Sequence, residues 1–211
     1  MSELRNHFEI LAERWDSIQT PDRGERLRRM LAPVVPLCRA SGSILEVGTG
    51  TGALIPCLQE CAPSARVVSI DLAAEMLWRA RRRCPGAAVV QADAHRPPFA
   101  APHFDLVICH NSFPHFADKP AALVNLASVV RPGGHLLILH DLSRERVNAI
   151  HGGGAPAIQH DLLPPGDEAG RMLARAGFSD VQVEDSDKGY MVGGRRYGNT
   201  GEGRDASDLA R

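Results

Sequence analysis

The chain has 211 residues, 44% of them hydrophobic and 23% charged, which is enough for one folded unit with a substantial core. Its net charge is −1, so the total charge gives no reason to expect a nucleic acid or an anionic membrane as a partner. No segment resembles a signal peptide, and no apolar run approaches the roughly 20 residues of a membrane span, so we expect a cytoplasmic protein.

Hydrophobic periodicity predicts alternating helices and strands along most of the chain. Two amphipathic helices come first, at residues 4–18 and 23–38. Strands are then predicted at 43–47, 66–70, 88–91, 105–109 and 135–140, with helices at 53–61, 73–83 and 120–130. A loop at 151–156, a helix at 167–176 and short strands at 181–184 and 190–192 complete the pattern. This alternation predicts an α/β fold with a doubly wound, mostly parallel sheet.

Three units follow from this pattern. Residues 1–40 are predicted to form a helical lid, residues 41–197 the main domain, and residues 198–211, which are rich in Gly, Asp, Arg and Ser, a disordered tail.

The first strand ends in a turn that carries three glycines, Gly48, Gly50 and Gly52. Glycine has no Cβ, so the backbone can turn sharply and lie close to a ligand. Asp71 ends the next strand, where an acidic side chain can accept hydrogen bonds from ribose hydroxyls. The combination predicts an adenosine-containing cofactor at the carboxyl edge of the sheet.

The turn by itself leaves the cofactor open, because Gly48-x-Gly50-x-x-Ala53 also fits the relaxed dinucleotide fingerprint. Glu46 lies two residues before Gly48, where a carboxylate suits an ammonium group better than a pyrophosphate. Further segments then follow in order at 89–94, with an Asp-Ala pair, at 104–111, and at 130–136, with an Arg-Pro-Gly-Gly turn. Together these motifs resemble the class I S-adenosylmethionine (SAM) dependent methyltransferases, over about residues 4–195.

The resemblance implies a seven-stranded sheet whose last strand is antiparallel, with SAM as the cofactor. It places Asp71 on the ribose and Asp93 with the Ala94 amide on the adenine, while Met76 packs beside the adenine or belongs to the plain helix core. The cofactor-binding residues that it implies are Glu46, Gly48, Thr49, Gly50, Gly52, Asp71, Leu72, Met76, Asp93, Ala94 and His110.

Histidines near the ends of the fourth and fifth strands are the candidates for catalysis. His115 is the first candidate for a general base, because histidine titrates near working pH, although a histidine here can also be structural and bonded to a backbone carbonyl. His140 is a second catalytic candidate across the cleft. His140, His151 and His160 could alternatively hold a divalent metal ion or line a polar pocket, together with Asp161 and with His110 or His115.

The predicted function is methyl transfer from SAM to a small-molecule acceptor by a monomer or homodimer, without nucleic acid or membrane partners. The acceptor and its reacting atom stay open. An aromatic lid segment with Phe8, Trp15 and Asp16 resembles that of small-molecule methyltransferases, or Trp15 packs simply on the sheet edge. Two other functions remain, namely a nicotinamide-dependent reductase and a SAM- or metal-binding module without turnover.

Overall fold

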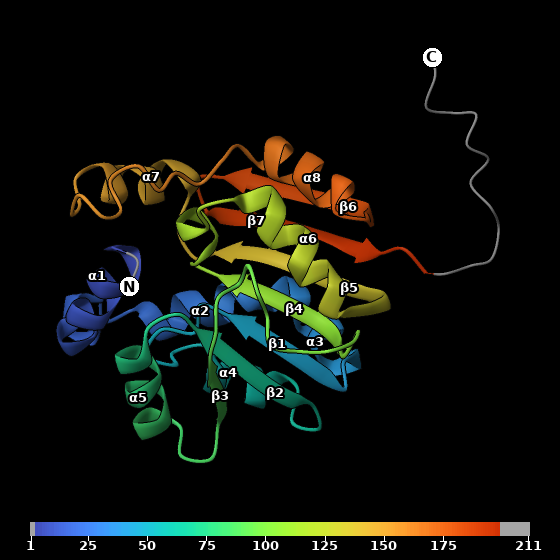
Figure 1. Ribbon diagram of the computed structural model, residues 1–211, viewed down its shortest axis with the longest axis horizontal. Coiled ribbons are helices and arrows are strands. Elements are labelled where there is room, and N and C mark those ends of the chain that lie inside the picture. The colour runs from blue at the N-terminus through green and yellow to red at the C-terminus, as the bar shows by residue number, and fades with distance from the viewer. Residues whose placement is uncertain (1–2, 199–211) are drawn as a thin grey trace.

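A computed structural model describes residues 3–198 and shows a seven-stranded sheet in the order β3-β2-β1-β4-β5-β7-β6 (Figure 1). Neighbouring strands are parallel except for β7, which is antiparallel to β5 and β6. The strands are β1 (Ser43–Val47), β2 (Arg66–Asp71), β3 (Ala88–Gln91), β4 (Phe104–His110), β5 (Val130–His140), β6 (Phe178–Ser186) and β7 (Gly189–Arg196). The predicted fold is confirmed. Residues 199–211 of the predicted tail lie outside the described residues.

Eight α-helices among the described residues surround this sheet. They are α1 (Glu3–Leu11), α2 (Arg23–Leu31), α3 (Val35–Ala40), α4 (Ile55–Cys61), α5 (Ala74–Arg83), α6 (Lys119–Val129), α7 (Arg144–Gly152) and α8 (Gly166–Arg175). Four short 3₁₀ turns join them, η1 (Ala12–Arg14), η2 (Asp16–Ile18), η3 (Ala32–Val34) and η4 (Phe113–His115). None of the helices in the described part of the chain is long and apolar enough to cross a membrane.

Alternating side chains of the central strands build a core on each face of the sheet. In β4, Leu106 and Ile108 pack with α2, α3 and α4, whereas Val107 and Cys109 pack with α6 and α8. This division follows from the two-residue period of a strand, in which successive side chains point to opposite faces. Because both faces are covered, the central strands are mainly apolar, and all five residues of β1 are buried, whereas most residues of the edge strand β6 are not.

The two predicted N-terminal helices are each interrupted in the structure. The first ends at Leu11 and continues as the turns η1 and η2. The second is divided by η3, and Pro33 and Pro36 lie at the start of η3 and α3. A proline lacks the N–H that a helix interior needs but is tolerated in the first turn, so each proline begins a new segment.

The region after α6 departs most from the sequence prediction. The Arg-Pro-Gly-Gly segment, predicted as a turn before the fifth strand, lies within β5, where the pairing with β4 shifts register. Helix α7 was not predicted, and residues 151–156 were predicted to be a loop. Ser143 caps this helix by accepting a hydrogen bond from the Arg146 amide. The strands β6 and β7 are also longer than predicted.

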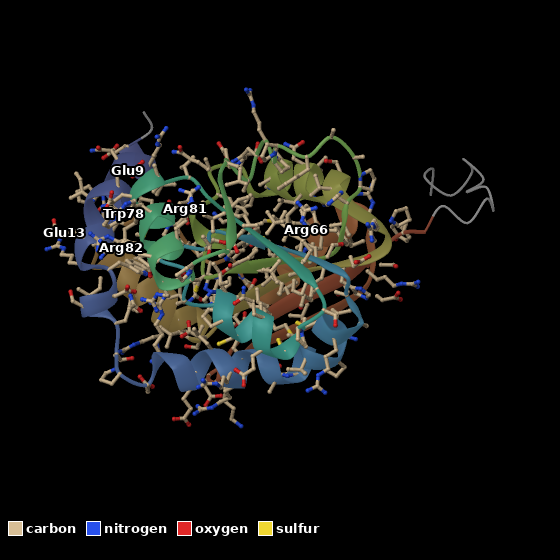
Figure 2. The ribbon with its side chains drawn as sticks, turned by 90° about the horizontal axis from the view of Figure 1, so that it is seen from below. Glu9, Glu13, Arg66, Trp78, Arg81 and Arg82 are labelled. Atoms are coloured by element: carbon tan, nitrogen blue, oxygen red, sulfur yellow. The ribbon has the colours of Figure 1, made fainter. Side chains whose placement is uncertain are left out.

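Helix α1 lies against α5 near the carboxyl ends of the parallel strands (Figures 1 and 2). The carboxylate of Glu9 accepts hydrogen bonds from the Ala74 and Glu75 amides at 2.9 and 2.7 Å. These are two of the free N–H groups at the start of α5, so Glu9 supplies from another helix the cap that α5 lacks. The N-terminal segment is thereby attached beside the strand ends.

Candidate functional site

The glycine turn after β1 has the backbone that the sequence predicts. Gly48, Gly50 and Gly52 have φ angles of +78°, +55° and +78°, in the left-handed region that favours glycine. A Cβ on Gly48 would lie 2.3 Å from the Cβ of Ser112, which itself donates a hydrogen bond to the Val47 carbonyl. A side chain at Gly48 therefore has no space, because the turn is packed against the end of β4.

Two carboxylates hold this turn from either side. Asp71, at the end of β2, accepts hydrogen bonds from the Gly50 amide at 2.8 Å and the Ala73 amide at 2.9 Å, and burial raises its pKa. Glu46 is fully buried in β1 and accepts hydrogen bonds from the hydroxyls of Thr49 and Ser69. Burial raises the pKa of Glu46 to about 7, and its Oε1 atom has no partner among the described residues.

A cavity of about 280 Å³ lies over the turn at the carboxyl edge of the sheet. The described residues that line it are Leu4, Phe8, Trp15, Val47, Gly48, Gly50, Ile70, Asp71, Leu72, Met76, Ala92, Asp93, Ala94, His95, Asn111, Ser112, His115, Phe116 and Ala117. Its walls are mainly apolar, with a few polar groups, which is the usual character of a small-molecule site.

Most of the predicted cofactor residues meet at this cavity, but four do not line it. Gly48, Gly50, Asp71, Leu72, Met76, Asp93 and Ala94 line it. The Thr49 hydroxyl, within the turn, donates to the carboxylate of Glu46 in β1, and Gly52 faces Ala80 of α5. His110 is buried, its Nε2 atom has no hydrogen-bond partner within residues 3–198, and burial lowers its pKa to about 4.

Asp93 lies at the other end of the cavity and is already engaged with His95. Its Oδ1 atom accepts from the His95 amide at 2.8 Å and lies 2.7 Å from the His95 Nδ1 atom. The Asp118 amide in turn donates to the Nε2 atom of His95. This chain of contacts fixes the loop after β3 and leaves the second carboxylate oxygen of Asp93 without a hydrogen bond from the described residues.

His115 lies in η4, lines the cavity and contacts a carboxylate rather than a backbone carbonyl. Its Nδ1 atom is 2.7 Å from the Oδ2 atom of Asp161, and its ring lies edge-on to Phe8 at 4.9 Å. Burial lowers the pKa of His115, although Asp161 acts in the opposite direction. The imidazole is therefore neutral near pH 7 and can take up a proton at Nε2.

The other predicted catalytic histidine lies away from the cavity. His140 is 2% exposed, its Nε2 atom has no partner among the described residues, and it does not line the cavity. Burial lowers its pKa to about 3. It packs edge-on against the ring of Tyr190 of β7 at 5.8 Å. In this structure His140 is a neutral core residue.

The alternative of a metal site in His140, His151 and His160 needs correction. Within residues 3–198, no group of three or more His, Cys, Asp or Glu side chains is arranged to hold a metal ion. His151 directs its Nδ1 atom to the carbonyl of Asp161, and His160 is exposed on the following turn. His151 thus holds the loop that carries Asp161, and its ring lies 4.8 Å from that of His115.

The N-terminal segment closes one side of the cavity. Leu4, Phe8 and Trp15 line it, and Phe8 and Trp15 meet edge-to-face at 6.3 Å. Asp16 accepts a hydrogen bond from the Thr51 hydroxyl of the glycine turn at 2.7 Å and pairs with Arg83 of α5. Trp15 therefore does not merely pack on the sheet edge, since it borders the cavity.

Sequence reasoning missed Asn111 as a site residue, and it grouped Asp161 with His115 only as members of a wider histidine cluster. Asn111 follows β4, lines the cavity and has a φ of +50°, unusual for a residue other than glycine. Its position directly after a strand that ends at the cofactor turn was the available signal. The pairing of Asp161 with His115 joins positions 46 residues apart through a loop, and no local pattern announces it.

Comparison with known proteins places these features among methyltransferases. Residues 45–138 match the family model described as "Methyltransferase domain". The demethylmenaquinone methyltransferase of Thermus thermophilus is 38% identical over 138 residues, which is 63% of this chain and 63% of that protein. The malonyl-[acyl-carrier protein] O-methyltransferase of Halorhodospira halophila is 32% identical over 188 residues, 86% of this chain and 63% of that protein.

The chain thus spans about three-fifths of the length of these two curated relatives. Among solved structures, a SAM-dependent methyltransferase from Thermotoga maritima aligns with a TM-score of 0.72 at 16% identity, covering 92% of this chain and 100% of that one. At this identity, the similarity supports the fold alone.

Proposed function

Because this chain belongs to the class I SAM-dependent methyltransferases, we propose that it transfers the methyl group of SAM to a small-molecule acceptor. The observation that carries the proposal is the cavity itself. The glycine turn, Asp71 and Asp93 line one cavity at the carboxyl ends of β1, β2 and β3, as the resemblance implies for the methionine, ribose and adenine parts of SAM.

The residues present fit that cofactor. Gly48 and Gly50 leave the backbone bare where a ligand approaches, and the free carboxylate oxygen of Asp93 can accept a proton from the adenine amino group. The Nε1 atom of Trp15 is buried beside Gly50, has no partner in the described part of the chain and can donate to a ligand. When bound, SAM supplies an activated methyl group on a sulfonium.

The protein's share of the reaction is alignment and proton removal. With SAM bound, the glycine turn, Asp71 and Asp93 would hold the methyl donor in place, and the cavity wall would align the acceptor atom with the methyl group that it supplies. We assign the proton that the acceptor loses to the Nε2 atom of His115. Asp161 holds the Nδ1 side of the ring and stabilises the imidazolium that forms.

The names of the relatives suggest two kinds of acceptor for this site, a quinone precursor and a carrier-bound malonyl group. Residues 3–18 would act as the lid, since Phe8 and Trp15 separate the cavity from solvent on that side. The cytoplasmic location, the absence of nucleic acid and membrane partners, and the monomeric or homodimeric state stay predictions.

The proposal is tested by calorimetric titration of the purified protein with SAM, S-adenosylhomocysteine and NADPH, followed by mass spectrometry of S-adenosylhomocysteine release with a panel of acceptors. We expect both SAM and S-adenosylhomocysteine to bind and NADPH not to compete. Displacement of SAM by NADPH would favour the reductase instead. Tight SAM binding without release of S-adenosylhomocysteine with any acceptor would favour a module without turnover.

A further inference from the structure

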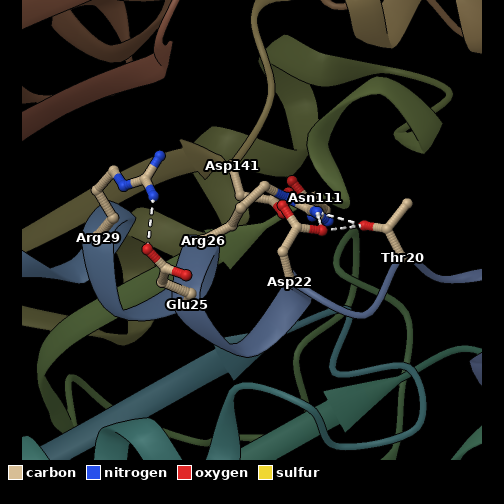
Figure 3. Close-up of polar contacts among 7 residues, drawn as sticks. All are labelled: Thr20, Asp22, Glu25, Arg26, Arg29, Asn111 and Asp141. Carbon is tan, nitrogen blue, oxygen red and sulfur yellow. Dashed lines mark hydrogen bonds and ion pairs between the residues drawn. The ribbon is translucent and has the colours of Figure 1, made fainter.

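A polar network centred on the buried carboxylate of Asp141 ties Asn111 to the N-terminal segment (Figure 3). The Nδ2 atom of Asn111 donates to Oδ1 of Asp141 at 2.6 Å, and Oδ2 of Asp141 accepts from Nε of Arg26 at 2.9 Å. Arg26 is held in turn by the hydroxyl of Thr20 and the carboxylate of Asp22. Only 5% of the Asp141 side chain is exposed, whereas Asn111 itself is exposed at the edge of the cavity.

This network determines which way the Asn111 amide faces. Burial acts to raise the pKa of Asp141, but the hydrogen bond from Asn111 and the charge of Arg26 together hold it below its ordinary value. An ionised carboxylate can only accept hydrogen bonds, so the NH₂ group of Asn111 must face Asp141. The carbonyl oxygen Oδ1 then faces away from Asp141, and no described residue donates to it.

His115, the second polar residue on this wall of the cavity, also presents a hydrogen-bond acceptor. The Asp161 carboxylate lies at Nδ1 of His115, so the ring proton belongs on Nδ1 and the lone pair on Nε2. No described residue bonds to Nε2. Asn111 and His115 both line the cavity beyond the glycine turn, so each offers a hydrogen-bond acceptor to whatever binds there.

The charged residues around the cavity also disfavour an anionic acceptor. Its described lining contains no lysine or arginine, and its carboxylates are Asp71 and Asp93. The nearby ammonium group of Lys119 is engaged by the carbonyls of Pro114 and Phe116. An anionic acceptor would therefore be repelled by the lone pairs of Asn111 and His115. An acceptor with an ammonium group would be repelled by the positive sulfonium of SAM.

We propose that the methyl acceptor is a neutral molecule that donates hydrogen bonds from hydroxyl groups to Asn111 and His115, and that carboxylate acceptors are excluded. This inference rests on the proposed methyl transfer and narrows its substrate class. Between the two kinds of acceptor named for the relatives, it favours a reduced, hydroxyl-bearing ring over a free malonyl carboxylate. Asp141 and Arg26 are positioning residues, since they act through the Asn111 amide.

The test measures dissociation constants by ligand-observed NMR with S-adenosylhomocysteine saturating. The probes are three matched compounds, resorcinol, 1,3-dimethoxybenzene and benzoate. Each hydrogen bond to a ligand is typically worth about 5- to 10-fold in affinity, so resorcinol should bind at least about 10-fold more tightly than either other probe. Equal affinities, tighter binding of benzoate, or no detectable resorcinol binding would overturn the assignment.

Variants then locate the preference. Asn111→Gly removes the amide but keeps a residue that tolerates a φ of +50°, so it should fold and weaken resorcinol about 5- to 10-fold. Asp141→Asn allows the Asn111 amide to rotate by about 180°. This variant should therefore show a smaller difference in affinity between resorcinol and benzoate. The control variant Asp187→Asn, on the exposed turn between β6 and β7, should change neither the affinity for resorcinol nor that for benzoate. Unchanged selectivity in Asn111→Gly refutes the proposal.

These outcomes separate the inference from the proposed function. Loss of S-adenosylhomocysteine binding in the wild type would contradict the methyltransferase proposal itself, before any acceptor probe is added. Normal S-adenosylhomocysteine binding combined with a preference for benzoate would leave that proposal standing and overturn only the neutral-acceptor assignment.

Discussion

Because the imidazole of His140 is buried, we predict that the free energy of unfolding falls at acidic pH. In the folded chain its pKa is lowered from 6.5 to about 3 by burial, chiefly, and by the neighbouring histidines. The unfolded chain therefore binds a proton that the folded chain refuses as the pH falls below 6.5. Each pH unit between these two values costs about 1.4 kcal/mol, so by about pH 5 this histidine alone should remove roughly 2 kcal/mol of folding stability.

The comparison uses His140→Leu against the wild type, with His160→Leu as the matched control on an exposed turn. Urea unfolding at about pH 7.5 and about pH 5 gives the loss of stability for each protein. His140→Leu should lose roughly 2 kcal/mol less than the wild type and the control over this interval. Glu46, whose pKa is raised to about 7, acts in the opposite direction but cancels in the comparison. An identical acid loss in all three proteins would refute the buried neutral state of His140.

Four further variants test the cavity. Asp71→Ala should weaken SAM by about 5- to 150-fold in calorimetry, because ribose hydroxyls would lose their acceptor on burial; unchanged affinity would exclude the ribose assignment. Gly48→Val should abolish SAM binding, because its Cβ would lie 2.3 Å from that of Ser112 at a φ of +78°; wild-type binding would show that the turn is not the cradle. His115→Ala should lower the methyl-transfer rate about 10²- to 10⁴-fold. Asp161→Asn should move the acidic limb of the pH–rate profile to lower pH, because Asp161 raises the pKa of His115. An acidic limb at the same pH in this variant would show that His115 is not the titrating base.

The sequence predicts the sheet well because its strands are signalled locally. The predicted bounds of β1 and β3 match the structure, and those of β2 and β4 differ by a residue or so at their ends. Buried parallel strands are short apolar runs that end in turn residues, so each one can be found without knowledge of its neighbours. The cofactor side of the cavity was predictable for the same reason, since the glycine turn and Asp71 lie at strand ends.

The acceptor side depends on contacts between distant segments. Asp161 meets His115 across a loop, and Arg26 reaches Asp141 over 115 positions. Pairs of residues so far apart in the sequence produce no periodic pattern from which they could be predicted. The many histidines after β4 suggested a metal site instead. His140 illustrates the difficulty, because a strand-end position is where sequence reasoning expects a functional side chain, yet the last residue of β5 is covered by Tyr190 of the antiparallel β7.

The charges around the glycine turn favour SAM over a dinucleotide, although Asp71 alone would suit the ribose of either cofactor. Asp71 and Asp93 line the cavity, Glu46 lies beneath the turn, and the described lining holds no lysine or arginine. A dinucleotide brings two phosphate charges to this turn and needs the start of a helix as counter-charge. Helix α4 begins only at Ile55, three residues beyond Gly52, and has seven residues. SAM instead carries a sulfonium and an ammonium group, for which acidic surroundings are favourable. The charge distribution therefore discriminates where the spacing of the glycines does not.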